Sequence, residues 1–316
     1  MTRVVVFAYS EVGYRCLQAL LQPGIEIVWV VTHHDDPNET RWYHSVAELA
    51  AASRLRVTEY ESLSAAECLE TLRTLAPDFL FSFYFRRMLG AAVLATARRG
   101  ALNMHGSLLP SYRGRAPINW AIANGEARTG ASLHYMVERP DAGELVDQEG
   151  VDIGVDETAL DVSMKVAAAA ETVLRRSLPA LIAGNAPRRP QDLGLGSYCR
   201  ARTPADGAID FARPAWEIHN LIRAVAPPFP GAYTDVPGQR LELLGSHWCN
   251  ERASAPERAP RMYASAGRMY LDCVDGRRLQ VTSAAFGGAP LDAKALDSRF
   301  GELSLTRQAR VAGANA

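Results

Sequence analysis

The stretch "ALNMHGSLLPSYRGRAP", residues 101–117, begins as an apolar run, reaches an Asn and a His two positions apart, and continues as a loop with two Gly and two Pro. If residues 100–104 form a strand, its side chains alternate, so Asn103 and His105 point to the same side. Polar groups on one side at the end of a buried strand are typical of the ligand crevice of an open α/β sheet. The alternative is a loop histidine that is hydrogen-bonded within a turn.

Apolar segments that alternate with helical segments surround this stretch. Strands are expected at residues 4–7, 25–32, 56–59 and 79–83, and helices at residues 12–21, 46–53 and 65–75. Because strands that alternate with helices favour a parallel, doubly wound sheet, we expect an α/β fold. A strand pair at residues 132–137 and 145–153 follows, and then a long helix from about Thr158 to Ile182, capped by Asp156 and followed by Gly184.

The pattern changes near residue 185. The stretch from Asn185 to Pro204 holds three prolines and is typical of a linker, and short apolar strands separated by turns follow it. We therefore expect an α/β domain at residues 1–188, a linker at 189–204, a small β-rich domain at 205–306 and a frayed tail at 307–316.

Composition excludes several classes of protein. Among 316 residues, 34 Lys and Arg balance 35 Asp and Glu, which argues against a bulk nucleic-acid binder. The five cysteines are odd in number and form no CxxC pair, so they predict neither a disulfide framework nor a zinc site and fit a reducing compartment. The first apolar run, Val4 to Ala8, is too short for a signal peptide or a membrane span. A cytoplasmic protein is expected.

Motifs that such a sheet often carries are missing. The first turn reads "AYSEVG" (residues 8–13) and lacks the GxGxxG glycines that let a dinucleotide approach the backbone, which argues against an NAD(P) dehydrogenase. The sequence also lacks the GxSxG elbow of α/β hydrolases and the P-loop of nucleotide triphosphatases. Residues 33–36, His-His-Asp-Asp, are adjacent on a loop and seldom converge on one ion, so no metal is expected.

Longer motifs carry a resemblance to a known family. Residues 105–122, "HGSLLPSYRGRAPINWAI", and 129–146, "TGASLHYMVERPDAGELV", resemble the folate-dependent formyltransferases. Similar segments are "FSFYFRRML" (81–89), "RTPADGAIDF" (202–211) and "IRAVAPPFPGAY" (222–233). The resemblance implies a Rossmann-like domain that carries the site, a smaller barrel-like (OB-like) β domain, and 10-formyltetrahydrofolate as co-substrate, with no NAD and no metal.

Within the family, one branch is most similar. Residues 4–13, "VVVFAYSEVG", and 32–51, "THHDDPNETRWYHSVAELAA", resemble the formyltransferase half of the bifunctional polymyxin-resistance enzyme, which formylates UDP-4-amino-4-deoxy-L-arabinose in lipid A modification. That likeness implies a nucleotide-sugar substrate, with neither nucleic acid nor membrane insertion. The dehydrogenase and decarboxylase activity of the bifunctional enzyme is expected on a separate chain.

Three residues are expected to perform the chemistry. Formyl transfer to an amine passes through a tetrahedral intermediate, and a fixed amide donor such as Asn103 stabilises its oxyanion. A neutral imidazole suits the relay of protons from the amine to the folate nitrogen, which is the role expected of His105. The family pattern places a carboxylate beside it, here Asp141, which is expected to orient His105 and raise its pKa to near or above 6.5. Taken alone, Asp141 would be a turn former before Gly143.

The resemblance also implies binding residues. The folate site carries over to Arg87, Met88, Leu89, Arg115, Val137, Glu138, Arg139, Pro140 and Asp141. Glu138 and Pro140 depart from the basic stretch that the related enzyme has at this place, and Pro140 lacks one backbone N–H that could donate to the pterin. Arg202 and Arg223 are candidates for the diphosphate of a sugar nucleotide, although a surface Arg is the simpler interpretation. His134 is expected to be a satisfied, partly buried histidine of a strand.

Other functions use the same three residues. Formyltetrahydrofolate hydrolases use water in place of the amine, and methionyl-tRNA formyltransferases act on a charged initiator tRNA that they grip with a Lys/Arg-rich insertion. The corresponding segment here, residues 32–46, holds three acidic residues against the single Arg41, so it should repel a tRNA backbone. A non-enzymatic folate or nucleotide sensor is a further alternative. The exact amino sugar stays open, because one side-chain change in a pocket can alter it.

Overall fold

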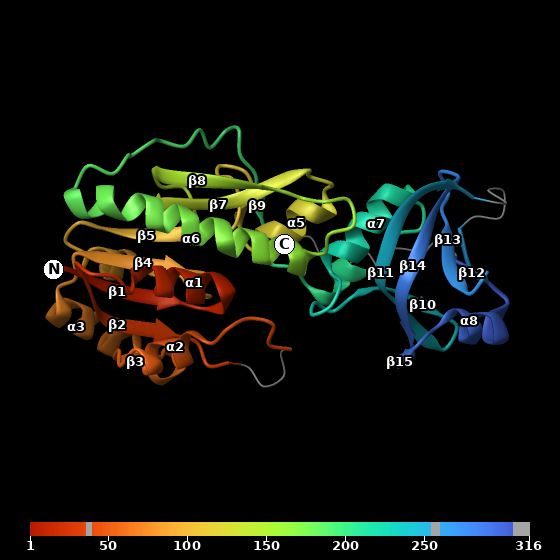
Figure 1. The fold of residues 1–316 in the computed structure, drawn as a ribbon, viewed down its shortest axis with the longest axis horizontal. Coiled ribbons are helices and arrows are strands. Elements are labelled where there is room, and N and C mark those ends of the chain that lie inside the picture. Colours follow the sequence, from red (N-terminus) through yellow and green to blue (C-terminus); the bar gives the residue numbers. More distant parts are fainter. Residues whose placement is uncertain (36–39, 254–259, 306–316) are drawn as a thin grey trace. The chain divides into compact units, whose positions relative to one another are not determined.

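A computed structural model of the chain describes residues 1–35, 40–253 and 260–305 (Figure 1). The chain divides into two compact units. Unit 1 consists of Met1–Ile118, Arg128–Asp152 and Val162–Ala201, and unit 2 of Asn119–Ala127, Ile153–Asp161 and Arg202–Ala316. No helix within the described ranges is both long enough and apolar enough to cross a membrane.

Unit 1 is built on a seven-stranded sheet in the order β3-β2-β1-β4-β5-β7-β8. Its strands are β1 (Thr2–Ala8), β2 (Ile25–Thr32), β3 (Val57–Glu59), β4 (Phe79–Phe83), β5 (Gly100–His105), β7 (Arg128–Tyr135) and β8 (Leu145–Asp152). The first five strands in this order run parallel, and β7 and β8 are antiparallel to their neighbours. The prediction of a mainly parallel α/β sheet is confirmed.

Helices cover both faces of this sheet. They are α1 (Ser10–Leu20), α2 (Val46–Ala52), the 3₁₀ turn η1 (Tyr60–Ser62), α3 (Ala65–Leu75), α4 (Ala91–Leu94) and α6 (Ala159–Ala183), whereas most of α5 (Pro117–Ala123) groups with unit 2. In Figure 1, α1 and α6 lie on the near face. On the face that carries Leu80 and Ala101, the fully buried Leu72 of α3 and the partly buried Leu94 of α4 fill the core. This face also holds the candidate site.

The cap of α6 differs from the prediction. Thr158 caps the helix, because its hydroxyl accepts a bond from the Asp161 N–H at 3.3 Å while the Asp161 carboxylate accepts bonds from Thr158. The predicted cap, Asp156, instead accepts a bond from the Trp248 N–H at 2.8 Å. A reciprocal Thr and Asp pair satisfies two free amide groups of the helix start, which one distant carboxylate would not do. Gly184 follows the helix with φ +79°, as expected.

Unit 2 is a curled antiparallel sheet in the order β10-β11-β14-β13-β12-β16. Its elements are the 3₁₀ turn η2 (Pro204–Gly207), α7 (Ala215–Ala224), β10 (Ala232–Val236), β11 (Gln239–Arg252), β12 (Arg261–Ser265), β13 (Arg268–Asp272), β14 (Arg277–Phe286), β15 (Ala289–Pro290), α8 (Ala293–Phe300) and β16 (Glu302–Ser304). Apolar side chains of α7, among them Ile222, pack with Leu241, Leu271 and Leu279 of the strands. The prediction of a β-rich second domain is confirmed.

The predicted linker is not a free connection. Residues 189–201 belong to unit 1, where Arg189 pairs with Leu145 and where β9 (Tyr198–Cys199) lies parallel to β6 (Arg113–Gly114). Two short segments, Asn119–Ala127 and Ile153–Asp161, group instead with unit 2. A boundary taken from proline content misses these contacts because they join residues far apart in the sequence. The predicted tail, residues 307–316, lies outside the described residues.

Candidate active site

The end of β5 brings together the three residues that were expected to act together. The Nδ2 atom of Asn103 lies 3.4 Å from Oδ1 of Asp141, and Nδ1 of His105 lies 3.6 Å from the same oxygen. Asn103 and His105 therefore project to the one side of the strand that faces Asp141, as the alternation of side chains requires. Asn103 is half-buried, whereas His105 is buried.

A backbone carbonyl sets the tautomer of His105. Nε2 of His105 lies 2.8 Å from the carbonyl oxygen of Tyr112, which can only accept a hydrogen bond. The neutral imidazole therefore carries its proton on Nε2, and Nδ1 keeps its lone pair. Since Nδ1 is the nitrogen that faces Asp141, a proton added there forms an ion pair with the carboxylate.

His134 also belongs to this cluster, which the sequence analysis did not predict. Its Nε2 lies 3.1 Å from Nδ2 of Asn103 and 3.5 Å from Oδ1 of Asp141, and its Nδ1 donates to the carbonyl of Tyr135 at 2.9 Å. The strand register explains the contact, because β7 runs antiparallel to β5 and pairs His134 directly with Asn103. The available signal was that Asn103 and His134 are polar residues within apolar strands. It could be used only with knowledge of how those two strands pair.

Asp141 is held as a carboxylate. Its Oδ2 accepts a bond from the backbone N–H of Gly114 at 2.9 Å, and its side chain is 14% exposed. Burial alone would raise the pKa of Asp141, but the attraction of His105 and the contact with His134 outweigh burial and lower that pKa well below its usual range. Asp141 is therefore charged at neutral pH.

The pKa of His105 moves in the direction opposite to the one expected. Burial disfavours the imidazolium and is the largest effect, so the pKa of His105 lies below the ordinary 6.5, although Asp141 and the Tyr112 carbonyl both act to raise it. The expectation of a pKa near or above 6.5 is wrong, because the balance between Asp141 and burial, which the sequence leaves open, is decided by burial. His105 is therefore neutral at pH 7.

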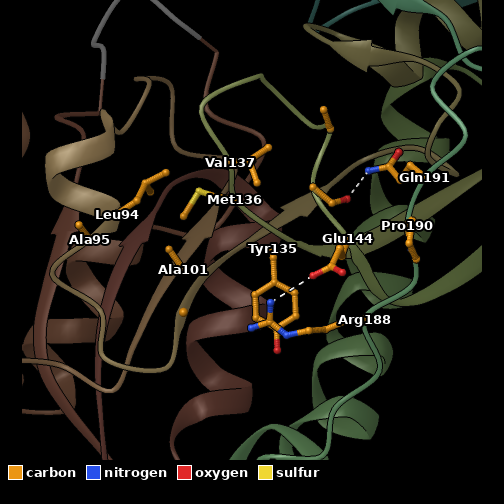
Figure 2. Close-up of a pocket in the computed structure, with 13 residues that line it drawn as sticks. Leu94, Ala95, Ala101, Tyr135, Met136, Val137, Glu144, Arg188, Pro190 and Gln191 are labelled. Atoms are coloured by element: carbon orange, nitrogen blue, oxygen red, sulfur yellow. Dashed lines mark hydrogen bonds and ion pairs between the residues drawn. The ribbon is translucent and has the colours of Figure 1, made fainter.

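A cavity of about 540 Å³ is lined by Tyr135 and Ala142, the sequence neighbours of His134 and Asp141, although the residues of the cluster do not themselves line it (Figure 2). Ala101, two residues before Asn103 on the same side of β5, lines it together with Leu94 and Met136. Its opposite wall is more polar, and there Arg188 lies 3.7 Å above the ring of Tyr135 and forms an ion pair with Glu144. The cavity thus joins an apolar wall to a polar one, as ligand pockets commonly do.

The residues expected to bind folate lie mostly on exposed loops. Val137 lines the cavity and is 46% exposed, and Leu89 packs against the core of the same face. Pro140 and Asp141 are half-buried. The remaining side chains are exposed: Arg87, Met88, Arg115, Glu138 and Arg139.

The two arginines that were expected to meet a diphosphate have other contacts within unit 2. Arg223 is 2% exposed, and its guanidinium donates to the Asn220 side chain and to the carbonyls of Gly154 and Glu157. Arg202 lies 4.6 Å from the centre of the Trp120 ring. Because Arg223 is buried and fully engaged, the structure gives no support to its role in substrate binding.

The adjacent residues His33 and His34 do not converge on a common point. Nδ1 of His33 lies 2.6 Å from Glu61, and its Nε2 accepts a bond from the Arg86 N–H at 3.1 Å. Asp36 lies outside the described residues. Across the ranges that the structure describes, no three His, Cys, Asp or Glu side chains are grouped so that they could hold a metal ion.

Comparisons with known proteins agree with this architecture. The family model "Formyl transferase" matches residues 2–178, and "Formyl transferase, C-terminal domain" matches residues 202–301. Similar solved structures include an N-formyltransferase from Helicobacter canadensis in complex with folinic acid and dTDP-3-aminofucose (TM-score 0.71, 20% identity, covering 89% of this chain and 99% of that one). Another is a 4-N formyltransferase from Francisella tularensis (TM-score 0.61, 18% identity, covering 73% and 91%). A third is WlaRD, a sugar 3N-formyl transferase in the presence of dTDP and 5-N-formyl-THF (TM-score 0.67, 19% identity, covering 89% and 97%). The chain belongs to the formyl transferase family.

Proposed function

We propose that this formyltransferase moves the formyl group of 10-formyltetrahydrofolate to the amine of a nucleotide-linked amino sugar. The observation that carries the proposal is the convergence of Asn103, His105 and Asp141 at the end of β5, beside a cavity. Two of the similar structures hold a formylated folate together with dTDP or a dTDP-amino sugar, which supports the same pair of ligands here.

In this proposal Asn103 stabilises the oxyanion of the tetrahedral intermediate. Both hydrogens of its amide are engaged in the free enzyme, one by His134 at 3.1 Å and the other by Asp141 at 3.4 Å. The second bond is long and therefore weak, so it is the one that an oxyanion would replace. The bond to His134 would keep the amide plane in place during this exchange.

His105 takes the proton of the attacking amine on Nδ1 and delivers it to the departing folate nitrogen. Tyr112 fixes the tautomer in which Nδ1 is free, and the charged Asp141 compensates the imidazolium that forms. The proton thus returns to the product tetrahydrofolate, and the enzyme ends in its starting state.

The cavity and the two exposed loops beside it are the proposed folate site. The apolar wall with Leu94, Ala101 and Met136 suits the flat pterin. Val137, at the start of the loop of residues 137–141, also lines the cavity, whereas residues 87–89 do not line it and are assigned to the folate site by the family resemblance. Pro140 cannot donate a backbone bond, so the amides of its neighbours would have to hold the pterin edge. Arg115 is exposed and free to meet the glutamate tail of the folate.

The proposed acceptor is UDP-4-amino-4-deoxy-L-arabinose, in lipid A modification, on the strength of the resemblance of residues 4–13 and 32–51. An initiator tRNA is disfavoured by the same region, because the guanidinium of Arg41 is paired with Asp35 and Glu48, each at 3.2 Å. A cation already paired with carboxylates attracts a phosphate backbone weakly.

A panel of acceptors tests this assignment. With 10-formyltetrahydrofolate present, we expect turnover with UDP-4-amino-4-deoxy-L-arabinose to exceed turnover with dTDP- and GDP-amino sugars, and we expect little formate release without an amine. Product masses and tetrahydrofolate release are the measurements. A preference for a dTDP-amino sugar would correct only the acceptor, whereas efficient, salt-sensitive formylation of methionyl-tRNA would overturn the sugar-nucleotide assignment.

The pH dependence of the rate follows from the position of His105. The neutral imidazole is the reactive form, and its pKa is lowered, so kcat/KM should rise with pH through a midpoint below about 6.5. Asp141→Asn removes an attraction that raises this pKa and should move the midpoint further down. A wild-type midpoint above 6.5, or an upward shift in Asp141→Asn, would contradict this account.

A further inference from the structure

Residues 189–201, the last segment of unit 1, contact both turns that hold the catalytic side chains. Nε2 of Gln191 donates to the carbonyl of Asp141 at 3.0 Å and to the carbonyl of Gly143 at 2.6 Å. Farther along, the hydroxyl of Ser197 accepts a bond from the N–H of Tyr112 at 2.8 Å. Tyr112 is the residue whose carbonyl fixes His105, so the segment reaches both sides of the cluster.

The turn that carries Asp141 is under local constraint. Asp141 has φ +52°, in the left-handed region, which L-residues rarely adopt because Cβ comes too close to the following carbonyl oxygen. A Cβ atom on Gly143 would lie only 1.9 Å from the carbonyl oxygen of Tyr135, so the backbones of Gly143 and Tyr135 approach too closely for any side chain at position 143. The backbone bond within the turn, from the Ala142 N–H to the Arg139 carbonyl, is long at 3.4 Å. The turn therefore depends on groups outside itself.

The Gln191 carboxamide matches this need. Its one nitrogen has two hydrogens, and the two oxygens it meets are backbone carbonyls, so the orientation of the amide is unambiguous. Its Oε1 is buried and accepts no hydrogen bond in the described part of the chain. An unsatisfied buried acceptor is unfavourable, so any stabilisation by this side chain comes from its two donated bonds. Figure 2 shows Gln191 at the cavity, and a dashed line marks one of its two hydrogen bonds.

We propose that Gln191 is a positioning residue, which holds the carboxylate of Asp141 against Asn103 and His105 by clamping the backbone of residues 141–143. The inference rests on the proposed function, in which Asp141 acts on His105. Asp141 Oδ1 lies 3.4 Å from Asn103 and 3.6 Å from His105, so both contacts are already long. A further displacement of about 1 Å would break them, and a misplacement of that size can lower a rate about a hundredfold.

Two substitutions test the clamp. Gln191→Ala removes both donors, and Gln191→Glu keeps the shape but directs a carboxylate at two carbonyl oxygens. Both are expected to lower kcat about tenfold or more, with a smaller change in KM, because a displaced Asp141 weakens the transition state more than substrate binding. The midpoint of kcat/KM against pH should also move down, as in Asp141→Asn, since a displaced carboxylate no longer raises the pKa of His105.

Hydrogen exchange provides a second measurement that does not depend on activity. Hydrogen exchange of the peptide that covers residues 136–145 should become faster in Gln191→Ala and Gln191→Glu than in the wild type. Leu195→Ala is the matched control, because Leu195 lies in the same segment and is 80% exposed. It should leave the rate, the pH midpoint and the exchange of residues 136–145 unchanged.

A double-mutant comparison separates positioning from general damage. If Gln191 acts through Asp141, Gln191→Ala should lower kcat little in an Asp141→Asn background. An undiminished additional loss there, or a Gln191→Ala rate within twofold of wild type, would overturn the clamp while leaving the proposed function intact. Near wild-type turnover of Asp141→Asn would instead overturn the catalytic role of Asp141 and the clamp together.

Discussion

His105→Ala is expected to lower kcat at least about a hundredfold, which makes it one of the two most damaging substitutions that the structure suggests. General acid–base catalysis by a positioned imidazole contributes roughly 10²–10⁴ to a rate. In this site the neutral tautomer of His105 is fixed by Tyr112, so its Nδ1 keeps a lone pair beside Asp141. The lone pair of His134 on Nε2 also lies near Asp141, but it accepts a hydrogen bond from the Asn103 amide at 3.1 Å. Single-turnover formyl transfer to the amino sugar is the measurement, because it isolates the chemical step.

The loss should occur without unfolding. His247→Ala is a matched control, since His247 is about half exposed and contacts Asp156 of unit 2 rather than the catalytic cluster. The thermal unfolding midpoint of each variant shows whether the fold is intact. A folded His105→Ala enzyme with near wild-type turnover would eliminate the proton relay proposed here.

Asn103→Ala should lower kcat about 10²–10³-fold, the usual cost of losing one oxyanion donor. The donor acts only when charge develops on the formyl oxygen, so KM for both substrates should change much less than kcat. Steady-state kinetics with the folate and the amino sugar varied in turn provide the test. Asn185→Ala, which removes an exposed carboxamide after α6, is the control. Equal losses in kcat and in substrate affinity would show that Asn103 binds the ground state instead.

The fold could be predicted because its signals are local. Apolar runs of four to eight residues alternate with helical periods in unit 1, and both are visible in the sequence without knowledge of their neighbours. Asn103 and His105 were found in the same way, because alternation along one strand is enough to place them together. Asp141 is 38 residues from Asn103 and came from the family resemblance rather than from pattern.

What the sequence did not disclose depends on long-range pairing. His134 joins the site only because β7 pairs with β5 in one particular register. The direction of the His105 pKa depends on burial, which is a property of the packed domain. Arg223 was expected at a surface and is buried, since three backbone and side-chain oxygens collect around its guanidinium. Residues 189–201 read as a linker because their bonds to unit 1 reach partners up to 85 positions away.

The pairing of β6 with β9 restricts how this family member can change over generations. Connections between domains usually tolerate insertions and deletions, because a longer loop costs little entropy. Here the Gln191 side chain is hydrogen-bonded to the turn at residues 141–143. Tyr198 and Cys199 pair in strand register with Arg113 and Gly114. One residue gained or lost between those two attachments displaces one of them by about 3.3 Å. In this segment we therefore expect insertions and deletions only after Ala201, where a change of length does not displace the contacts to the catalytic cluster.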